Sequence, residues 1–190
     1  MSYLEDLKLL VKEMLKDDKS GHDYAHVLRV LENAKKIAIN EEVDSEVLEI
    51  AALLHDIAFS KGILEGAHGD ISAEIAKEII GKTNISEEKR KKILQAVKFH
   101  DLYHRAGKEP TESIYLETKI IQEAGSLDSL GYIGVIRAVS YATKVKKDPV
   151  QIIKNQLGRL DNFNTKYGKE VAGARVKVME DFLKGIEGEL

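Results

Sequence analysis

The sequence contains no cysteine, no tryptophan and only two prolines among its 190 residues. Without cysteine, the chain has no disulfide scaffold, no zinc–thiolate site, no iron–sulfur cluster and no thiol nucleophile. The longest wholly apolar run, residues 50–54, is far too short to cross a membrane, so we expect no membrane partner. Glu5 and Asp6 stand where a signal peptide would be basic, which favours a cytoplasmic protein.

An excess of positive charge is also lacking. The 29 Lys and Arg residues are interspersed with 32 Asp and Glu residues, and the formal net charge is −3. Because nucleic-acid binders usually carry a basic excess, we expect no nucleic-acid partner. The 43% hydrophobic content is that of a globular protein. The length suits one domain, and we expect a single domain over residues 1–190.

Hydrophobic residues recur three or four positions apart along nearly the whole chain and nowhere alternate convincingly at two. This pattern predicts an all-α domain of eight to ten helices. Residues 47–58 are apolar on most sides and predict a central buried helix that begins after Asp44. A later stripe runs from 127 to 139. Ser86 is typical of a helix start, and Gly81 of a helix end.

All histidines of the chain fall within its first 104 residues: His22, His26, His55, His68, His100 and His104. This clustering indicates a metal or acid–base site, and the alternative is a chance scatter of surface histidines. His22 and His26 are four residues apart, so they share one face of a helix. Two histidines at that spacing can share a metal ion, but the pair alone is a weak signal.

The most informative pair is His55-Asp56, because it lies in AALLHDIAF, the most hydrophobic stretch of the chain. An ionised carboxylate in such a place destabilises the fold unless a cation or hydrogen bonds compensate its charge. Adjacent residues of a helix point about 100° apart, so both reach one ion only near a helix end or a helix junction. The alternative is a histidine bonded to a backbone carbonyl beside a carboxylate that caps a neighbouring helix.

The strings GHDYAHVLRV and AALLHDIA together resemble the HD-domain family of metal-dependent phosphohydrolases. The likeness continues through HGDISAEIA, through Arg137-Ala138 and into the tail NTKYG, and it is closest to a small single-domain bacterial and archaeal branch. The resemblance implies a helical fold in which His26, His55 and Asp56 hold a divalent ion. With only nitrogen and oxygen ligands, manganese, iron, cobalt, nickel or magnesium would suit the site.

One position departs from the family pattern. Where the family has its last aspartate ligand, this sequence has Gly125, which offers no side-chain ligand. Asp128 lies three residues further, on roughly the same helix face, and we expect it to be the substitute metal ligand. The departure leaves open a second hypothesis, a catalytically inactive HD-fold protein that binds a nucleotide or a metal. A third, a helical interaction module, is disfavoured by the charge within AALLHDIAF.

The resemblance implies hydrolysis of a small-molecule phosphate, a nucleotide or a related phosphate ester. Three residues are expected to act in catalysis, by neutralising phosphate charge, passing a proton or activating water: Lys61, His68 and Asp23. Three others are expected to bind the substrate: Arg29, His22 and His100. His104 is expected to face solvent.

Overall fold

The computed structural model describes residues 3–63, 68–102 and 113–189. Within these ranges the chain forms nine α-helices and no strand, which confirms the all-α prediction. The α-helices are α1 (Tyr3–Met14), α2 (Tyr24–Ile37), α3 (Ser45–Leu54), α4 (His68–Ile80), α5 (Glu87–Phe99), α6 (Leu116–Asp128), α7 (Gly131–Val145), α8 (Pro149–Leu157) and α9 (Lys166–Glu189). Three 3-10 helices accompany them: η1 (Ala38–Asn40), η2 (Ile57–Lys61) and η4 (Gly158–Asn162).

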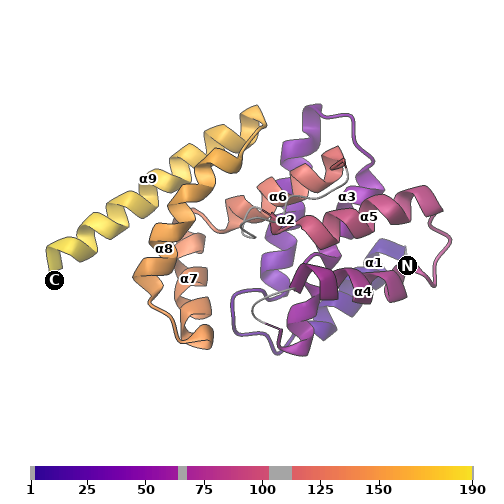
Figure 1. Cartoon of the computed structure of the whole chain (residues 1–190), viewed down its shortest axis with the longest axis horizontal. Coiled ribbons are helices and arrows are strands. Elements are labelled where there is room, and N and C mark those ends of the chain that lie inside the picture. The colour runs from indigo at the N-terminus through magenta and orange to yellow at the C-terminus, as the bar shows by residue number, and fades with distance from the viewer. Residues whose placement is uncertain (1–2, 64–67, 103–112, 190) are drawn as a thin grey trace.

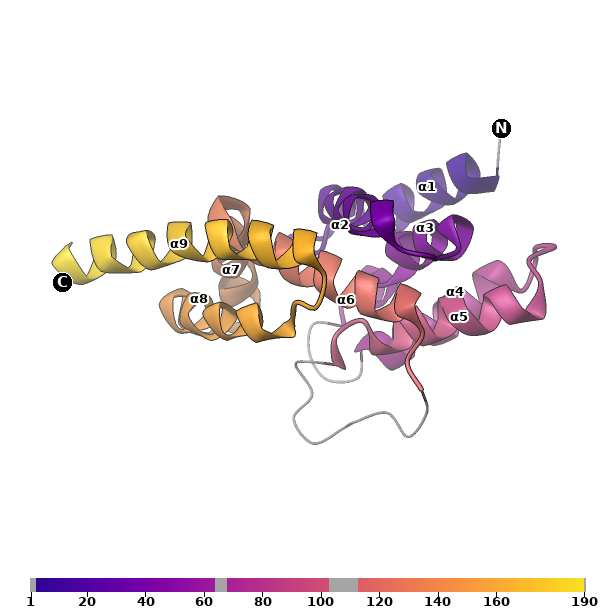
Figure 2. The ribbon, with the colours of Figure 1, turned by 90° about the horizontal axis from the view of Figure 1, so that it is seen from above.

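The helices form two groups that α6 connects (Figure 1). Helices α1 to α5 lie on one side, and α7, α8 and α9 on the other; Figure 2 shows the same division from above. Helix α6 packs against α2, α3 and α5 in the first group and against α9 in the second. The end of α6 therefore stands where the two groups meet.

The core is centred on α3, whose hydrophobic side chains are all buried. Asp44 caps this helix by accepting hydrogen bonds from the backbone N–H groups of Glu46 and Val47, as the sequence predicted. Helix α3 contacts α1, α2, α5 and α6. Each fully buried Leu or Ile side chain contributes about 1.5–3 kcal/mol relative to an exposed one, so α3 is the main anchor of the fold.

Two expected helical stretches are interrupted. The helix predicted over 47–58 ends at Leu54, and Asp56 has left helical geometry at φ −110° and ψ 20° before η2 begins. The stripe over 127–139 spans the end of α6 and the start of α7, where Gly131 has a φ of 73°. Apolar spacing alone did not reveal either break, because hydrophobic residues continue through both.

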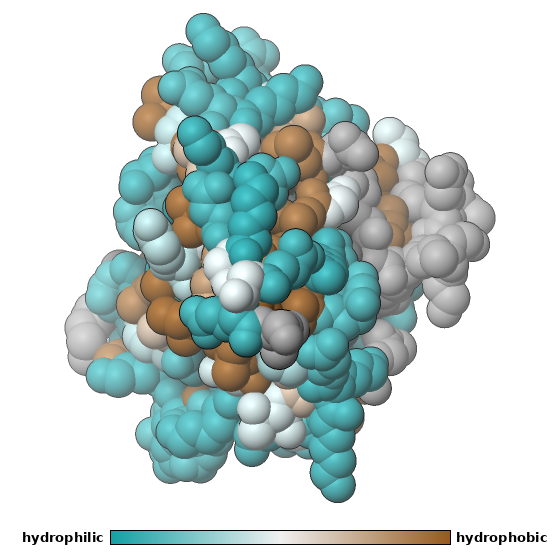
Figure 3. Space-filling model, turned by 90° about the vertical axis from the view of Figure 1, so that its left-hand side faces the viewer, coloured by the Kyte–Doolittle hydropathy of each residue, from teal (hydrophilic) through white to brown (hydrophobic). Residues whose placement is uncertain are grey.

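Among the residues that the structure describes, no helix is both long and apolar enough to span a bilayer. On the side of the molecule shown in Figure 3, hydrophilic residues surround smaller groups of hydrophobic ones.

Candidate metal centre

Three buried side chains converge where α2 begins and α3 ends. His26 Nε2 lies 3.2 Å from His55 Nε2 and 3.1 Å from Asp56 Oδ2. His55 Nε2 lies 3.2 Å from the same Asp56 oxygen. All three residues are at most 3% exposed. The early end of α3 brings His55 and Asp56 to one point, which is the condition that the sequence set for a shared ion.

The hydrogen bonds made by the Nδ1 atoms of His26 and His55 determine whether their Nε2 atoms face this point as donors or as acceptors. His26 Nδ1 donates to Asp128 Oδ2 at 2.6 Å, and His55 Nδ1 donates to the carbonyl of Ala52 at 2.8 Å. A neutral imidazole has one N–H, so the Nε2 atoms of both rings present lone pairs. Two lone pairs and an anionic oxygen therefore face one another, an arrangement that a cation stabilises.

The spacing of these donor atoms fits a metal ion. Ligand atoms bonded at about 2.1 Å and lying 90° apart around one ion are about 3.0 Å from each other. The three separations measured among His26, His55 and Asp56 are 3.1–3.2 Å. Two imidazoles and a carboxylate suit manganese, iron, cobalt or nickel. The residues present therefore fit a divalent ion.

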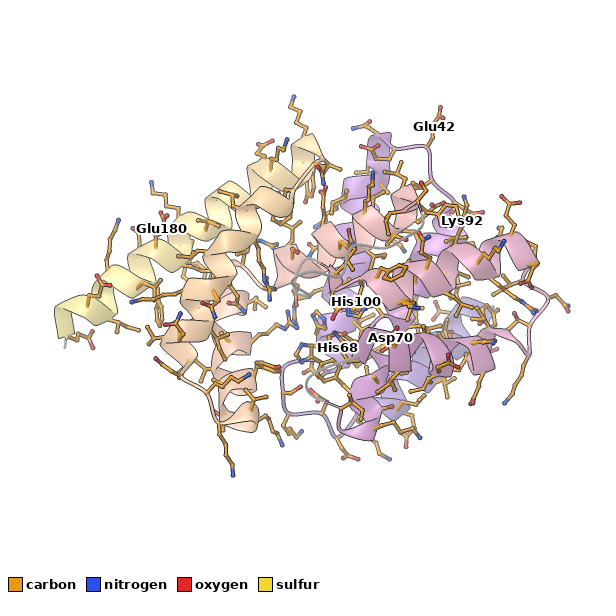
Figure 4. The ribbon with its side chains drawn as sticks, in the orientation of Figure 1. Glu42, His68, Asp70, Lys92, His100 and Glu180 are labelled. Atoms are coloured by element: carbon orange, nitrogen blue, oxygen red, sulfur yellow. The ribbon has the colours of Figure 1, made fainter. Side chains whose placement is uncertain are left out.

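The second oxygen of Asp56 faces a second group of possible ligands. Asp56 Oδ1 lies 3.0 Å from His100 Nε2 and 3.8 Å from His68 Nε2, and these two ring nitrogens are 3.2 Å apart. Figure 4 shows His68 and His100 close together near the middle of the molecule, from the start of α4 and the end of α5. Both groups have the spacing of metal ligands, and Asp56 belongs to both.

Burial and neighbouring charge shift the pKa values of this cluster. Burial raises the pKa of Asp56, but the imidazoles of His55, His100 and His26 outweigh it and hold the pKa well below its ordinary value. Burial lowers the pKa of His55. Burial also opposes the charge of His100, but its hydrogen bond to Asp56 prevails and raises its pKa. Without an ion, the Asp56 carboxylate is thus ionised, and it favours the protonated form of His100.

Asp128 lies outside the group of possible ligands formed by His26, His55 and Asp56. Its carboxylate contacts His26 Nδ1, the ring nitrogen that points away from the cluster. Arg29 donates to both carboxylate oxygens, at 2.7 and 3.0 Å, and Arg137 Nη1 lies 3.2 Å from Oδ2. The structure thus places Asp128 behind the ring of His26, where carboxylates commonly lie behind a metal-bound histidine, and not beside its Nε2 atom.

Three other predicted site residues lie outside the pocket that the cluster lines. Arg29 is engaged with Asp128. Asp23 caps α2 and accepts a hydrogen bond from the backbone N–H of His26 at 2.9 Å, so it positions His26. Lys61 is exposed at the end of η2. His104 falls outside the described residues.

The remaining predicted residues line the pocket together with the cluster: His22, His68 and His100. His22 stacks on Phe59 with ring centroids 3.9 Å apart, and its Nδ1 lies 3.0 Å from Ser20 Oγ. Burial holds the pKa of His22 well below its ordinary value, so its ring is neutral at pH 7. His22 thus contributes an uncharged ring to the wall.

Gly125 lies in α6 on the wall of the same pocket. A Cβ atom at this position would meet no neighbouring atom within 4 Å. The missing side chain is therefore replaced by open space and not by packed protein. Among the described residues, the first group of possible ligands has no member from α6.

The opposite wall comes from the second helix group and was missed by the sequence analysis. Four of its residues lie in α7, α8 and η4: Tyr141, Ile152, Gln156 and Arg159. These four residues lie outside the sequence motifs that contain the histidines. They come close to the cluster only because the two helix groups pack together. Arg137, which the sequence analysis noted in its late motif, also reaches this pocket.

Comparison with known proteins connects this site to a family. Residues 23–130 match the family model described as the HD domain, and this span contains both groups of possible ligands. The span covers more than half of the chain.

Relatives resemble the chain over nearly its whole length. It is 28% identical to the uncharacterised protein YpgQ of Bacillus subtilis, over 98% of this chain and 93% of YpgQ. The crystal structure of YpgQ in complex with ADP superposes with a TM-score of 0.76 at 21% identity, covering 98% and 94% of the two chains. A predicted HD superfamily hydrolase from an uncultured Thermotogales bacterium gives a TM-score of 0.70 at 28% identity, covering 98% and 92%.

Proposed function

Because the chain belongs to the HD-domain family, we propose that it is a metal-dependent phosphohydrolase acting on a nucleotide or a related phosphate ester. The structural relatives described as HD-superfamily hydrolases support the reaction class. The ADP complex of YpgQ supports a nucleotide as the ligand. We further propose that residues 1–190 form one domain, since α6 packs against both helix groups.

The observation that carries this proposal is the convergence of two imidazole lone pairs on the buried Asp56 carboxylate. We assign His26, His55 and Asp56 as the ligands of a divalent ion. When bound, such an ion lowers the pKa of a coordinated water and polarises a phosphoryl oxygen. Asp128 keeps the lone pair of His26 directed at the site, because it accepts the proton on the opposite nitrogen.

His68 and His100 lie beside the second carboxylate oxygen of Asp56, and both line the pocket. We propose that they bind the phosphoryl group, since a protonated imidazole donates hydrogen bonds to phosphate oxygens. The raised pKa of His100 favours that protonated form. Their alternative task is to hold a second ion that Asp56 would share, as the second group of possible ligands permits. The number of ions bound per chain separates these two tasks.

The second candidate function is an HD-fold protein that binds a nucleotide or a metal without hydrolysing it. Gly125 favours it, because the wall of α6 supplies no carboxylate to the cluster. A site with fewer protein ligands holds its ion less tightly. The two candidates differ in turnover, which the second one lacks.

A hydrolysis assay with matched carboxylate variants tests the proposal. Phosphate release from nucleoside mono-, di- and triphosphates would be followed with manganese, nickel, cobalt or magnesium present. We expect Asp56→Asn to abolish turnover. The control Asp70→Asn changes an exposed carboxylate on α4 and should leave turnover intact. Metal binding by the wild type without phosphate release from any substrate would favour the binding protein.

A further inference from the structure

The pocket wall opposite the cluster carries polar groups that the proposed chemistry does not use. Gln156 is buried near the end of α8, and Arg159 follows three residues later in η4; both line the pocket. Tyr141 from α7 and Ile152 from α8 line the same part of the pocket. This surface, Tyr141, Ile152, Gln156 and Arg159, is called the distal wall below.

Gln156 presents a buried acceptor without a donor. The residue is only 8% exposed, and its Oε1 atom has no hydrogen-bond partner within the described part of the chain. Buried side-chain oxygens in folded proteins are nearly always hydrogen-bonded. An unmatched acceptor in a pocket wall therefore marks a place where a ligand supplies the donor.

Arg159, in contrast, presents hydrogen-bond donors without an acceptor among the described residues. It is partly buried in the pocket wall, and no carboxylate or other hydrogen-bond partner contacts it among the residues that the structure describes. Burial and the nearby guanidinium of Arg137 lower the pKa of Arg159 to about 10, so it stays charged at neutral pH. Its guanidinium has N–H donors available for an acceptor on a ligand.

We propose that the distal wall binds the base of a nucleotide substrate, with Arg159 donating to a base acceptor and Gln156 Oε1 accepting from a base N–H. The inference rests on the phosphohydrolase function proposed above, and it assigns a binding site to the base, the part of the substrate that does not react. The edges of the nucleobases offer adjacent donors and acceptors. Tyr141 and Ile152 supply the apolar surface against which a planar ring packs.

The two residues together favour a base over a second phosphate. An ionised phosphate has only acceptors and complements the guanidinium of Arg159, whereas the Gln156 Oε1 atom, as it is placed, needs a donor. A base edge satisfies both residues at once. The orientation that follows places the phosphates towards the histidines and the base towards α8.

Two variants with a matched control test this assignment. Gln156→Leu removes the acceptor and keeps the size of the side chain. Arg159→Gln removes the charge, and Lys154→Gln removes an equal charge from an exposed position of α8. For each protein, KM and kcat would be measured with a nucleoside triphosphate and with inorganic tripolyphosphate, which has no base. Circular dichroism would verify the fold.

We expect Gln156→Leu and Arg159→Gln each to raise KM for the nucleotide by about tenfold or more, the range of a lost hydrogen bond to a charged or buried group. KM for tripolyphosphate should stay within about twofold in Gln156→Leu, and Lys154→Gln should resemble the wild type. An equal rise for both substrates in Arg159→Gln would assign that residue to phosphate and overturn the proposal. Unchanged KM for the nucleotide in both variants would also overturn it.

A binding measurement tests the distal wall even if the protein has no hydrolytic activity. If the wild type hydrolyses neither compound, calorimetry in the presence of manganese would compare the binding of the same two compounds. A higher Kd in Gln156→Leu for the nucleotide, with no change for tripolyphosphate, would then support the role of the distal wall, although the phosphohydrolase proposal had failed. Equal Kd values in the wild type and Gln156→Leu would contradict it.

Discussion

Replacing Asp128 by asparagine should weaken both the fold and the affinity for a divalent ion. The Asp128 carboxylate accepts hydrogen bonds from His26 and Arg29 and lies within 3.2 Å of Arg137, while its side chain is 2% exposed. Asparagine keeps the shape of the side chain but loses the charge. Its amide nitrogen would also point at neighbours that are themselves donors, so at least one contact would be lost.

The pKa of Asp128 gives the size of the effect on stability. Burial raises this pKa, but the hydrogen bonds from His26 and Arg29 and the charge of Arg137 outweigh it and lower the pKa from 3.8 to about 2. At 1.36 kcal/mol per pKa unit, the ionised form contributes about 2 kcal/mol to the free energy of unfolding. Removing one partner of a buried ion pair typically costs about 3–5 kcal/mol. We therefore expect a loss of about 2–5 kcal/mol at pH 7.

The sign of the pH dependence follows from the lowered pKa. The contribution of the Asp128 charge is complete above its ordinary pKa and is lost as the pH falls through the lowered value of about 2. The difference in stability between the wild type and Asp128→Asn should therefore be largest at neutral pH and shrink below about pH 4. Urea unfolding of both proteins at several pH values measures this difference.

The effect on metal binding separates positioning from general destabilisation. Loss of the carboxylate behind a metal-bound histidine typically weakens metal affinity by about 10–100-fold. Glu123→Gln is the matched control: Glu123 is equally buried in α6 but accepts hydrogen bonds from the backbone and hydroxyl of Thr165, away from the cluster. Both variants should lose stability, and only Asp128→Asn should bind manganese more weakly. Equal manganese affinity in Asp128→Asn and the wild type would refute the role assigned to Asp128.

Three further changes have defined outcomes. Gly125→Asp should strengthen manganese binding, measured by calorimetry, because the added side chain enters open space in the pocket wall; unchanged affinity would mean that it does not reach the ion. Burial raises the pKa of Asp44, but hydrogen bonds from Lys89 and the backbone of α3 outweigh it and lower the pKa. The stability advantage of the wild type over Asp44→Asn should thus be present at neutral pH and disappear in urea titrations as the pH falls below that lowered pKa. Ser72→Ala should lower the free energy of unfolding by about 1–3 kcal/mol, since it leaves the buried backbone N–H of Ala58 without its acceptor, and an unchanged urea midpoint would contradict this.

Hydrophobic spacing predicted the helical class, and the polar residue before the apolar run predicted the cap at Asp44. The carboxylate inside AALLHDIAF indicated that a cation or hydrogen bonds must compensate its charge, whereas the choice of His26, His55 and Asp56 as ligands came from the resemblance to the HD-domain family. The structure adds the early end of α3, which lets His55 and Asp56 converge. Hydrophobic spacing did not reveal this end because η2 continues the apolar run.

The structure places Asp128 away from the expected ligand position, because residue spacing predicts a face of the helix and not the atom that a side chain contacts. Asp128 does reach His26, but at the nitrogen opposite the cluster. Gln156 and Arg159 could not be predicted at all, because their nearness to the histidines arises from the packing of α7 and α8 beside the first helix group. No local pattern encodes a contact between segments so far apart in the chain.

The central claim, that His26, His55 and Asp56 hold a divalent ion, is tested most directly by counting ions. The protein would be loaded with manganese, dialysed against metal-free buffer and analysed for metal content. We predict at least one retained ion per chain in the wild type and in Asp70→Asn, and none in Asp56→Asn. Two ions per chain would assign His68 and His100 to the second one. A wild-type protein that retains no ion would contradict the claim.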